Sequence, residues 1–184
     1  MKKIFRQQIV NQRKLLSPKV LLGYNQQFLR QFIAFLKLYQ TTHRPKIIGG
    51  YVPINNELNA LPLLDYCRSV GYKTALPYCH GLNIPLSFHA FDGNELTLKP
   101  DKYQIPAPNS TSPVIIPDLI ICPSVGVCSH SNKRLGYGGG FFDRYHGLHP
   151  HCHFVAGFSD FQVIHNPAIF APHDLNFHKV FILN

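Results

Sequence analysis

The sequence contains few acidic residues and none near its start. Only 9 of its 184 residues are Asp or Glu, against 18 Lys or Arg, which gives a formal net charge of +9. The first carboxylate belongs to Glu57, whereas residues 1–50 contain ten Lys or Arg. Such a basic surface attracts anions, either nucleic acid or a nucleotide such as ATP. Because the chain has no recognition-helix signature and no RNA-binding aromatic motif, we expect no specific nucleic-acid partner.

Other features that are missing narrow the class of protein further. No apolar run approaches the roughly 18 residues that span a bilayer, and no signal-peptide core follows the basic start. The five cysteines show no C-x-x-C spacing, and no H-x-x-x-H pair is formed among His146, His149, His165, His173 and His178, so neither a disulfide framework nor a zinc site is indicated. With 45% hydrophobic and 15% charged residues, the chain is typical of a globular protein. We expect one domain over residues 1–184, a monomer in the cytoplasm that is not attached to a membrane.

The most informative segment is rich in glycine. Residues 134–144 read Arg-Leu-Gly-Tyr-Gly-Gly-Gly-Phe-Phe-Asp-Arg, with four glycines in five positions. Glycines leave the backbone bare, so its amide groups can approach a ligand closely, and phosphate is the ligand that such amides favour. Arg134 has the charge to balance a phosphate, and Asp143 is the kind of ligand that Mg²⁺ prefers. Glycine content alone also fits a simple turn or linker, and the segment matches neither the Walker pattern nor G-x-G-x-x-G.

The surroundings of this segment favour the phosphate-binding interpretation. Residues 118–123 form a short apolar run that ends at a proline, as expected of a buried strand, and residues 141–148 can start a helix. A strand, a glycine loop and a helix start together make an anion site.

The rest of the chain alternates between helical and extended patterns. Helices are predicted over 2–16, from Ser17-Pro18 to about 39, and from Asn55 or Asn56 to near 71, where Pro62 disturbs the first turn. Strands are predicted near 47–52, 74–76, 118–123, 154–158 and 180–183, with a hairpin formed by 86–91 and 96–98 and a proline-rich loop over 99–117. This order predicts an α/β fold with a mainly parallel sheet and helices on both faces. Residues 51–57 and the glycine loop both follow strands, so we expect them to face one crevice.

The glycine motif, together with several weaker motifs in the same order, resembles the 5-formyltetrahydrofolate cyclo-ligase family, also called 5,10-methenyltetrahydrofolate synthetase. The weaker motifs are Lys2-Lys3 with Arg6, residues 51–57, residues 105–108, residues 118–123, and His173-Asp174. The resemblance implies a three-layer α/β sandwich. It also implies the ATP-dependent conversion of 5-formyltetrahydrofolate to 5,10-methenyltetrahydrofolate, with release of ADP and phosphate. In that chemistry ATP phosphorylates the formyl oxygen, and nitrogen 10 then closes the ring.

The same resemblance assigns roles to individual residues. It implies that the ATP-binding residues are Lys2, Arg6, Arg134, Leu135, Gly136, Tyr137, Gly138, Gly139, Gly140, Phe141 and Phe142. Residues implied to bind the reduced folate are Val52, Glu57, Tyr137, Gly138, Gly139, Gly140 and Phe141. Arg134 and Tyr137 are implied to be catalytic, and Asp143 and Asp174 to hold Mg²⁺. Many relatives have two tyrosines where this chain has Phe141 and Phe142, so two hydroxyl groups are missing here.

The residues alone leave simpler interpretations open. Lys2 and Arg6 fit a solvated basic face, Asp143 fits a carboxylate at a helix start, and Glu57 fits the same description beside Asn55 and Asn56. Two other functions also stay open. One is an inactive homologue that binds folate or nucleotide and acts in regulation or on RNA. The other is a different phosphate-ester enzyme, such as a sugar-phosphate isomerase, which needs a general base and no ATP.

Overall fold

The computed structural model describes all residues from 1 to 184 and has a six-stranded sheet as its central layer. The strand order is β11-β9-β6-β1-β2-β3, and every neighbouring pair is parallel except β2 and β3. The strands are β1 (Ile47–Gly49), β2 (Lys73–Tyr78), β3 (Ser87–Ala90), β6 (Leu119–Ile121), β9 (His153–Ser159) and β11 (Lys179–Leu183). The helices are α1 (Lys2–Lys14), α2 (Pro18–His43), α3 (Leu61–Ser69) and α4 (Phe141–Leu148).

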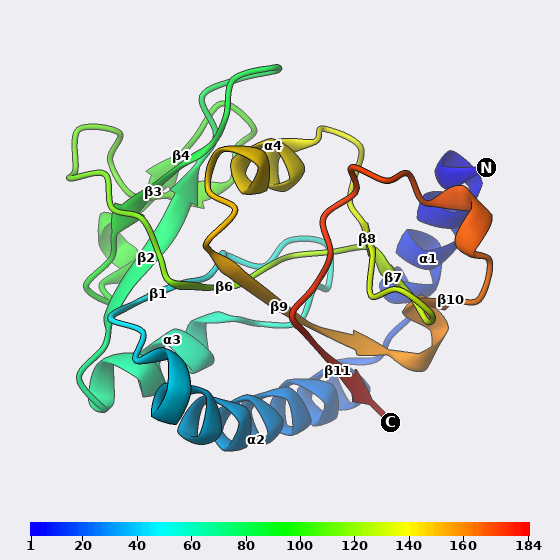
Figure 1. Cartoon of the computed structure of the whole chain (residues 1–184), viewed down its shortest axis with the longest axis horizontal. Helices are drawn as coiled ribbons and strands as arrows, with labels where there is room; N and C mark the ends of the chain where they lie inside the picture. The colour runs from blue at the N-terminus through cyan, green and yellow to red at the C-terminus, as the bar shows by residue number, and fades with distance from the viewer.

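Helices cover both faces of this sheet, as predicted (Figure 1). Helices α2 and α3 lie on one face and α4 lies on the other. Side chains along β6 point alternately to the two faces of the sheet, so both faces need to be covered by helices. Leu119 and Ile121 belong to the core under α2 and α3, whereas Ile120, between them, belongs to the core under α4. The structure is therefore the three-layer sandwich that the family resemblance implied.

Helix α2 forms much as its sequence predicts. The Ser17 hydroxyl oxygen accepts a hydrogen bond from the Val20 amide at 3.3 Å, and Pro18 occupies the first turn, where its missing N–H costs nothing. Phe28, Phe32 and Leu36 repeat every four residues and are buried. The helix continues to His43 rather than ending near Tyr39.

None of the helices combines the length and the apolar character needed to cross a bilayer.

A smaller sheet carries the glycine loop. It consists of β10 (Val163–Ile164), β7 (Gly126–Cys128) and β8 (Arg134–Leu135), and α1 packs against it through Ile9. The prediction that the loop follows the strand over 118–123 is therefore wrong in detail. Two short strands intervene after β6, and the loop begins directly after β8.

The predicted start of the third helix is wrong. Asn55 and Asn56 have φ angles of 50° and 55°, in the left-handed region, and make a turn. Helix α3 begins only at Leu61, so that Pro62 lies in its first turn. Proline has no amide hydrogen and is tolerated only there, which places the start of the helix beside it.

The predicted hairpin of residues 86–91 and 96–98 is also wrong. Strand β3 pairs antiparallel with β2, and Glu95–Thr97 forms a 3-10 helix. The Asn94 side chain accepts a hydrogen bond from the Leu96 amide at 3.1 Å, and Leu96 is 96% exposed. This local bond competes with strand pairing.

The proline-rich loop contains one short pair of strands, β4 (Lys99–Pro100) and β5 (Pro106–Ala107). The chain also has 3-10 helices at Asp160–Gln162 and Pro167–Ile169.

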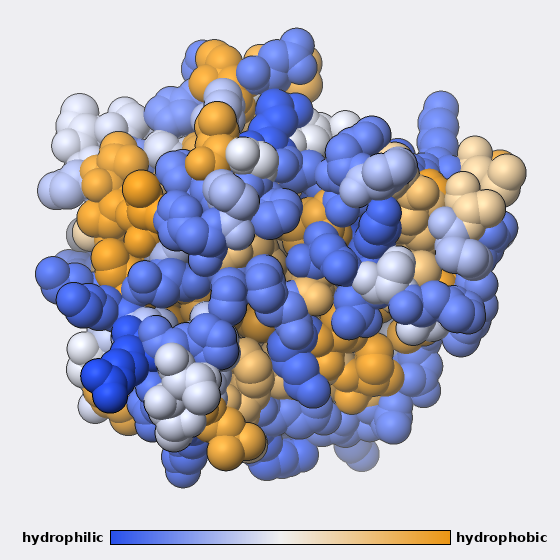
Figure 2. All heavy atoms as spheres, viewed as in Figure 1, coloured by the Kyte–Doolittle hydropathy of each residue, from blue (hydrophilic) through white to orange (hydrophobic).

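The outer surface is mostly hydrophilic on the face drawn in Figure 2, where apolar residues appear in separate patches. The largest apolar side chains are inside, and Phe28, Phe32, Phe88, Phe154 and Phe158 are fully buried. The packing of α2 on the sheet thus depends on aromatic side chains.

Replacing Phe32 by Ala should lower the free energy of unfolding by about 3–5 kcal/mol, because it removes apolar contact and leaves a cavity. Denaturant unfolding monitored by circular dichroism measures this change. Leu38→Ala, on the same helix but 74% exposed, serves as the matched control and should change stability by less than about 0.5 kcal/mol. Equal effects of the two substitutions would contradict the packing described here.

Candidate active site

Two cavities lie on either side of the glycine loop. The larger has a volume of about 310 Å³ and mostly apolar walls, and the smaller, called here the polar cavity, has a volume of about 220 Å³ and is lined mainly by charged residues and glycines. Arg134 and Gly140 line both. A ligand in one cavity is therefore separated from a ligand in the other only by the loop and by the Arg134 side chain.

The larger cavity lies beyond the carboxyl ends of three neighbouring strands. Tyr51 and Val52 follow β1, Cys79 follows β2, and Pro123 follows β6, and all four line it. The glycine loop and residues of the 101–106 segment complete its walls. The prediction that residues 51–57 and the glycine loop face one crevice is confirmed.

Backbone geometry at two glycines shapes the loop. Gly138 and Gly140 have φ angles of 108° and 66°, which residues with a Cβ atom rarely adopt. Gly140 is also the residue before the first turn of α4, and no side chain caps that helix. The amide groups at the start of α4 are thus free of side-chain partners beside the polar cavity.

Cations and carboxylates are paired within the polar cavity. Lys2 Nζ lies 2.6 Å from Asp174 Oδ2, and Arg134 Nη1 lies 3.2 Å from Asp143 Oδ2. Backbone amides hold the same carboxylates, because Ala171 N donates to Asp174 at 2.6 Å and Leu175 N donates to Asp143 at 3.1 Å. One short segment therefore fixes both aspartates at this cavity.

Two arginines are anchored to carbonyl groups. Arg134 donates from Nε and Nη2 to the Pro123 oxygen at 3.1 and 2.9 Å, and its guanidinium lies over the Phe142 ring. Arg6 donates from Nε to the Gly136 oxygen at 2.6 Å. Both cations are thus held in place, and both line the polar cavity.

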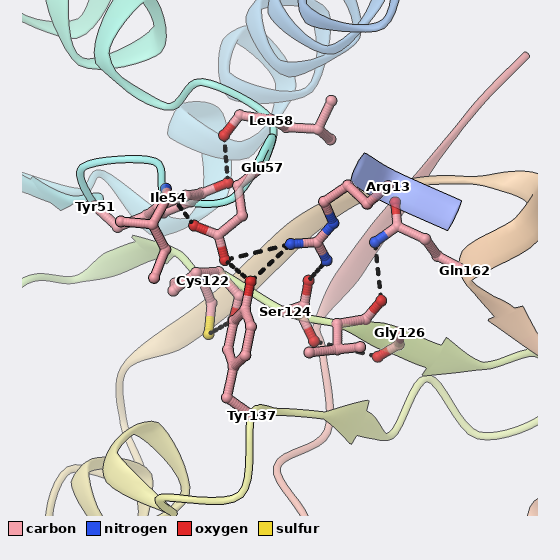
Figure 3. A network of polar contacts seen from close by, with 12 residues as sticks. Arg13, Tyr51, Ile54, Glu57, Leu58, Cys122, Ser124, Gly126, Tyr137 and Gln162 are labelled. Carbon is pink, nitrogen blue, oxygen red and sulfur yellow. Dashed lines mark hydrogen bonds and ion pairs between the residues drawn. The ribbon is translucent and has the colours of Figure 1, made fainter. Parts of the chain in front are cut away.

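A network of polar contacts connects α1, the loop before α3 and the glycine loop (Figure 3). Arg13 and Glu57 are buried in it, whereas Tyr137 is 41% exposed. Tyr137 donates its hydroxyl hydrogen to Glu57 Oε1 at 2.7 Å and accepts a hydrogen bond from Arg13 Nη1 at 2.7 Å. The Ile54 amide donates to Glu57 Oε2 at 3.0 Å. Burial raises the pKa of Glu57 above its ordinary value, while these hydrogen bonds and the nearby Arg13 charge oppose the rise. Burial, followed by the charge of Glu57, raises the pKa of Tyr137 as well.

Comparison with known proteins identifies the family. Residues 1–180 match the model of the 5-formyltetrahydrofolate cyclo-ligase family. This chain belongs to that family. A curated relative, the 5-formyltetrahydrofolate cyclo-ligase of Mycolicibacterium smegmatis, is 29% identical over 122 residues, which cover 63% of this chain. In that match the chain spans 60% of the relative's length.

Two solved structures share the fold of this cyclo-ligase family member. A 5,10-methenyltetrahydrofolate synthetase from Mycoplasma pneumoniae has a TM-score of 0.75 and 20% identity, with 98% of this chain and 97% of that chain covered. A 5,10-methenyltetrahydrofolate synthetase from Aquifex aeolicus has a TM-score of 0.76 and 21% identity, with 98% and 89% covered.

Every residue to which the family resemblance assigned a role lines at least one of the two cavities. The polar cavity contains Lys2, Arg6, Arg134, Leu135, Gly136, Gly138, Gly140, Asp143 and Asp174. The larger cavity contains Val52, Glu57, Arg134, Tyr137, Gly139, Gly140, Phe141 and Phe142. Residues expected to bind ATP are thus divided between the two spaces, which lie on opposite sides of one loop.

Sequence reasoning missed some residues of the site. Arg13 is 2% exposed and bonded to Tyr137, and it follows Lys2 and Arg6 at spacings of eleven and seven residues, close to one face of a helix. That spacing was the signal that could have found it. Asp101 and Tyr103 line the larger cavity from the proline-rich loop, where the sequence shows no comparable signal.

Proposed function

We propose that this protein converts 5-formyltetrahydrofolate to 5,10-methenyltetrahydrofolate and cleaves ATP to ADP and phosphate. The observation that carries the proposal is the pair of cavities that share Arg134 and Gly140. An apolar cavity of about 310 Å³ suits the flat ring system of a folate, and a cavity lined by three cations suits phosphates. Transfer of a phosphoryl group between two substrates requires such neighbouring sites.

The need for ATP follows from the chemistry of the formyl group. Its amide-like oxygen is a poor leaving group, and transfer of the γ-phosphoryl group to that oxygen makes a good one. Nitrogen 10 then attacks the activated carbon and the ring closes, nitrogen 10 releases its proton, and the C–O bond breaks as phosphate leaves. The protein contributes positioning and neutralisation of charge more than covalent chemistry.

The polar cavity has the groups that this reaction needs at the phosphate end. Lys2, Arg6 and Arg134 supply positive charge, and the bare loop between Arg134 and Asp143 supplies amide groups. We assign Arg134 to the transferred phosphoryl group, because it alone among these cations lines both cavities. Tyr137 then acts at the folate side of the same loop.

The donors of the polar cavity fit a magnesium ion bound with ATP. Mg²⁺ takes one or two carboxylates together with phosphate oxygens and water, and Asp143 and Asp174 both line this cavity. When bound, Mg²⁺ supplies charge neutralisation for the phosphates. Each carboxylate is paired with a cation of the site, Asp143 with Arg134 and Asp174 with Lys2. An ion that took over these carboxylates would release both cations to the nucleotide.

At the folate end we assign Glu57 to the pterin ring. A carboxylate accepts paired hydrogen bonds from the amino group and ring nitrogen of a pterin, and Glu57 is the carboxylate of the 51–57 segment in the larger cavity. Val52 and Phe141 add apolar contact beside it. Phe141 and Phe142 keep the aromatic packing that tyrosines would give, without their hydroxyl groups.

The reaction itself is the first test. The purified protein mixed with 5-formyltetrahydrofolate, ATP and Mg²⁺ should produce the near-ultraviolet absorbance of the methenyl product, and omission of any one component should abolish it. Binding of folate or nucleotide without this signal would instead favour an inactive homologue. A protein indifferent to folate would favour a different phosphate enzyme.

Replacing Asp143 by Ala should reduce turnover by more than about 100-fold while the protein remains folded, because a metal ligand is lost rather than core volume. Steady-state kinetics at saturating Mg²⁺ measures the effect, and the melting temperature verifies folding. Asp160→Ala, on the exposed surface, is the control for loss of an acidic charge. Wild-type turnover in the Asp143 variant would refute its role.

Replacing Glu57 by Gln should weaken folate binding by at least about tenfold, since hydrogen bonds to a charged group are lost. ATP affinity, measured in the absence of folate, should change less than about threefold by the same reasoning. Calorimetric titration with each ligand separates the two effects. Equal weakening of both would count against a pterin contact.

A further inference from the structure

The position of Arg13 is unusual for a charged side chain that no substrate needs to touch. It is 2% exposed, it lines neither of the two cavities beside the glycine loop, and it lines a third cavity of about 20 Å³. Its nearest carboxylate is Glu57, with 3.6 Å between Nη1 and Oε1. Burial of a charge is costly unless the charge is paired and hydrogen-bonded. The burial of Arg13 therefore requires a structural explanation.

The hydrogen bonds of Arg13 have only one possible direction. Arginine only donates, and it donates from Nη1 to the Tyr137 oxygen and from Nη2 to the Ser124 carbonyl at 2.9 Å. Because Tyr137 accepts from Arg13, its own hydrogen is free to go to Glu57 Oε1. Glu57 Oε2 is held by the Ile54 amide. Both carboxylate oxygens of Glu57 thus accept a hydrogen bond, which favours the ionised form against the effect of burial and fixes the plane of the carboxylate.

The same helix also reaches the polar cavity. Arg6 lies seven residues, or two helical turns, before Arg13, and it donates to the carbonyl of Gly136. Gly136 directly precedes Tyr137. Helix α1 therefore contacts the glycine loop at two points. Arg6 donates a hydrogen bond to the backbone beside Tyr137, and Arg13 donates one to the hydroxyl group of Tyr137. Movement of Arg6 toward a phosphate would be transmitted to the residue that orients Glu57.

We propose that Arg13 is a positioning residue that orients Glu57 through Tyr137 and, by way of α1, couples the folate cavity to the nucleotide cavity. The proposal rests on the function proposed above, since it assigns the two cavities to folate and ATP. Its consequence is synergy, in which each substrate binds more tightly when the other is present, by the same factor in both directions.

The charge of Glu57 depends on few neighbours. The charged and titratable groups around it are Arg13, Tyr51, Cys122, Arg134 and Tyr137. Burial raises the pKa of Tyr51, and it raises the pKa of Cys122 to about 12, so both are neutral at pH 7. Loss of Arg13 or of the Tyr137 hydroxyl removes a group that stabilises the carboxylate. Each change should raise the pKa of Glu57, and folate binding should then be lost at a higher pH as the pH falls.

Calorimetric titration of 5-formyltetrahydrofolate, with and without a non-hydrolysable ATP analogue and Mg²⁺, tests the coupling. In the wild type the analogue should tighten folate binding at least about fivefold. Arg13→Gln and Tyr137→Phe should each reduce this factor to near one, and the acidic limit of folate binding should move to higher pH. Lys14→Gln, an exposed neighbour on α1, should retain the wild-type factor. No tightening in the wild type, or unchanged tightening in both folded variants, would overturn the proposal.

A second measurement needs no ligand and therefore does not depend on the proposed reaction. The carboxyl carbon of Glu57, followed by nuclear magnetic resonance in protein labelled at glutamate, reports its titration directly. The midpoint should rise in Tyr137→Phe and in Arg13→Gln relative to the wild type and to Lys14→Gln. Melting temperatures show which variants fold, and Tyr137→Phe, which removes only one oxygen atom, keeps the test available if Arg13→Gln does not. An unchanged midpoint in the folded variants would overturn the positioning role, even where the enzyme assay succeeds.

Discussion

The candidate active site depends on three cations of α1 that contact residues far away in the chain. Lys2 pairs with Asp174, Arg6 bonds the carbonyl of Gly136, and Arg13 bonds the hydroxyl of Tyr137. These contacts bring α1 against the small sheet and the glycine loop. Without them the polar cavity would lose the Lys2 and Arg6 side of its wall, and Glu57 would lose the cation closest to it.

The ligand-free arrangement already places opposite charges next to one another. Each cation of the polar cavity has a carboxylate or carbonyl partner, so none is left as an isolated charge. Nucleotide phosphates and a divalent cation present the same two signs of charge. Binding can then exchange partners between existing pairs, which avoids the large desolvation cost of creating new ones. In the proposed reaction, such an arrangement would favour phosphoryl transfer.

Local sequence signals predicted the parts of the fold that local physics controls. Ser17-Pro18 predicted the start of α2, and the apolar run over 118–123 predicted the central strand β6. The glycine motif led to the residues of both cavities, because few other requirements favour such a dense run of glycines. Family resemblance, rather than periodicity, supplied distant members of the site such as Asp174.

The errors arose where a distant or competing contact decides the structure. Asparagine is a good helix cap, yet Asn55 and Asn56 both have left-handed backbone angles. Helix α3 begins only at Leu61, beside Pro62. Strand β3 pairs with β2 rather than with residues 96–98, and this pairing depends on the whole sheet. Arg13 was not predicted to be part of the site, because only the folded chain shows the tyrosine and glutamate that surround it.

The ion pair between Lys2 and Asp174 joins residues 172 positions apart, and that separation has a consequence for biosynthesis. A ribosome makes the first helix early and the aspartate near the end, so the helix emerges long before its partners exist. Contacts between such remote segments also close slowly, because a long loop of chain must be ordered first. The polar cavity can thus be completed only after Asp174 has been made, when β11 is the one strand of the central sheet still to follow.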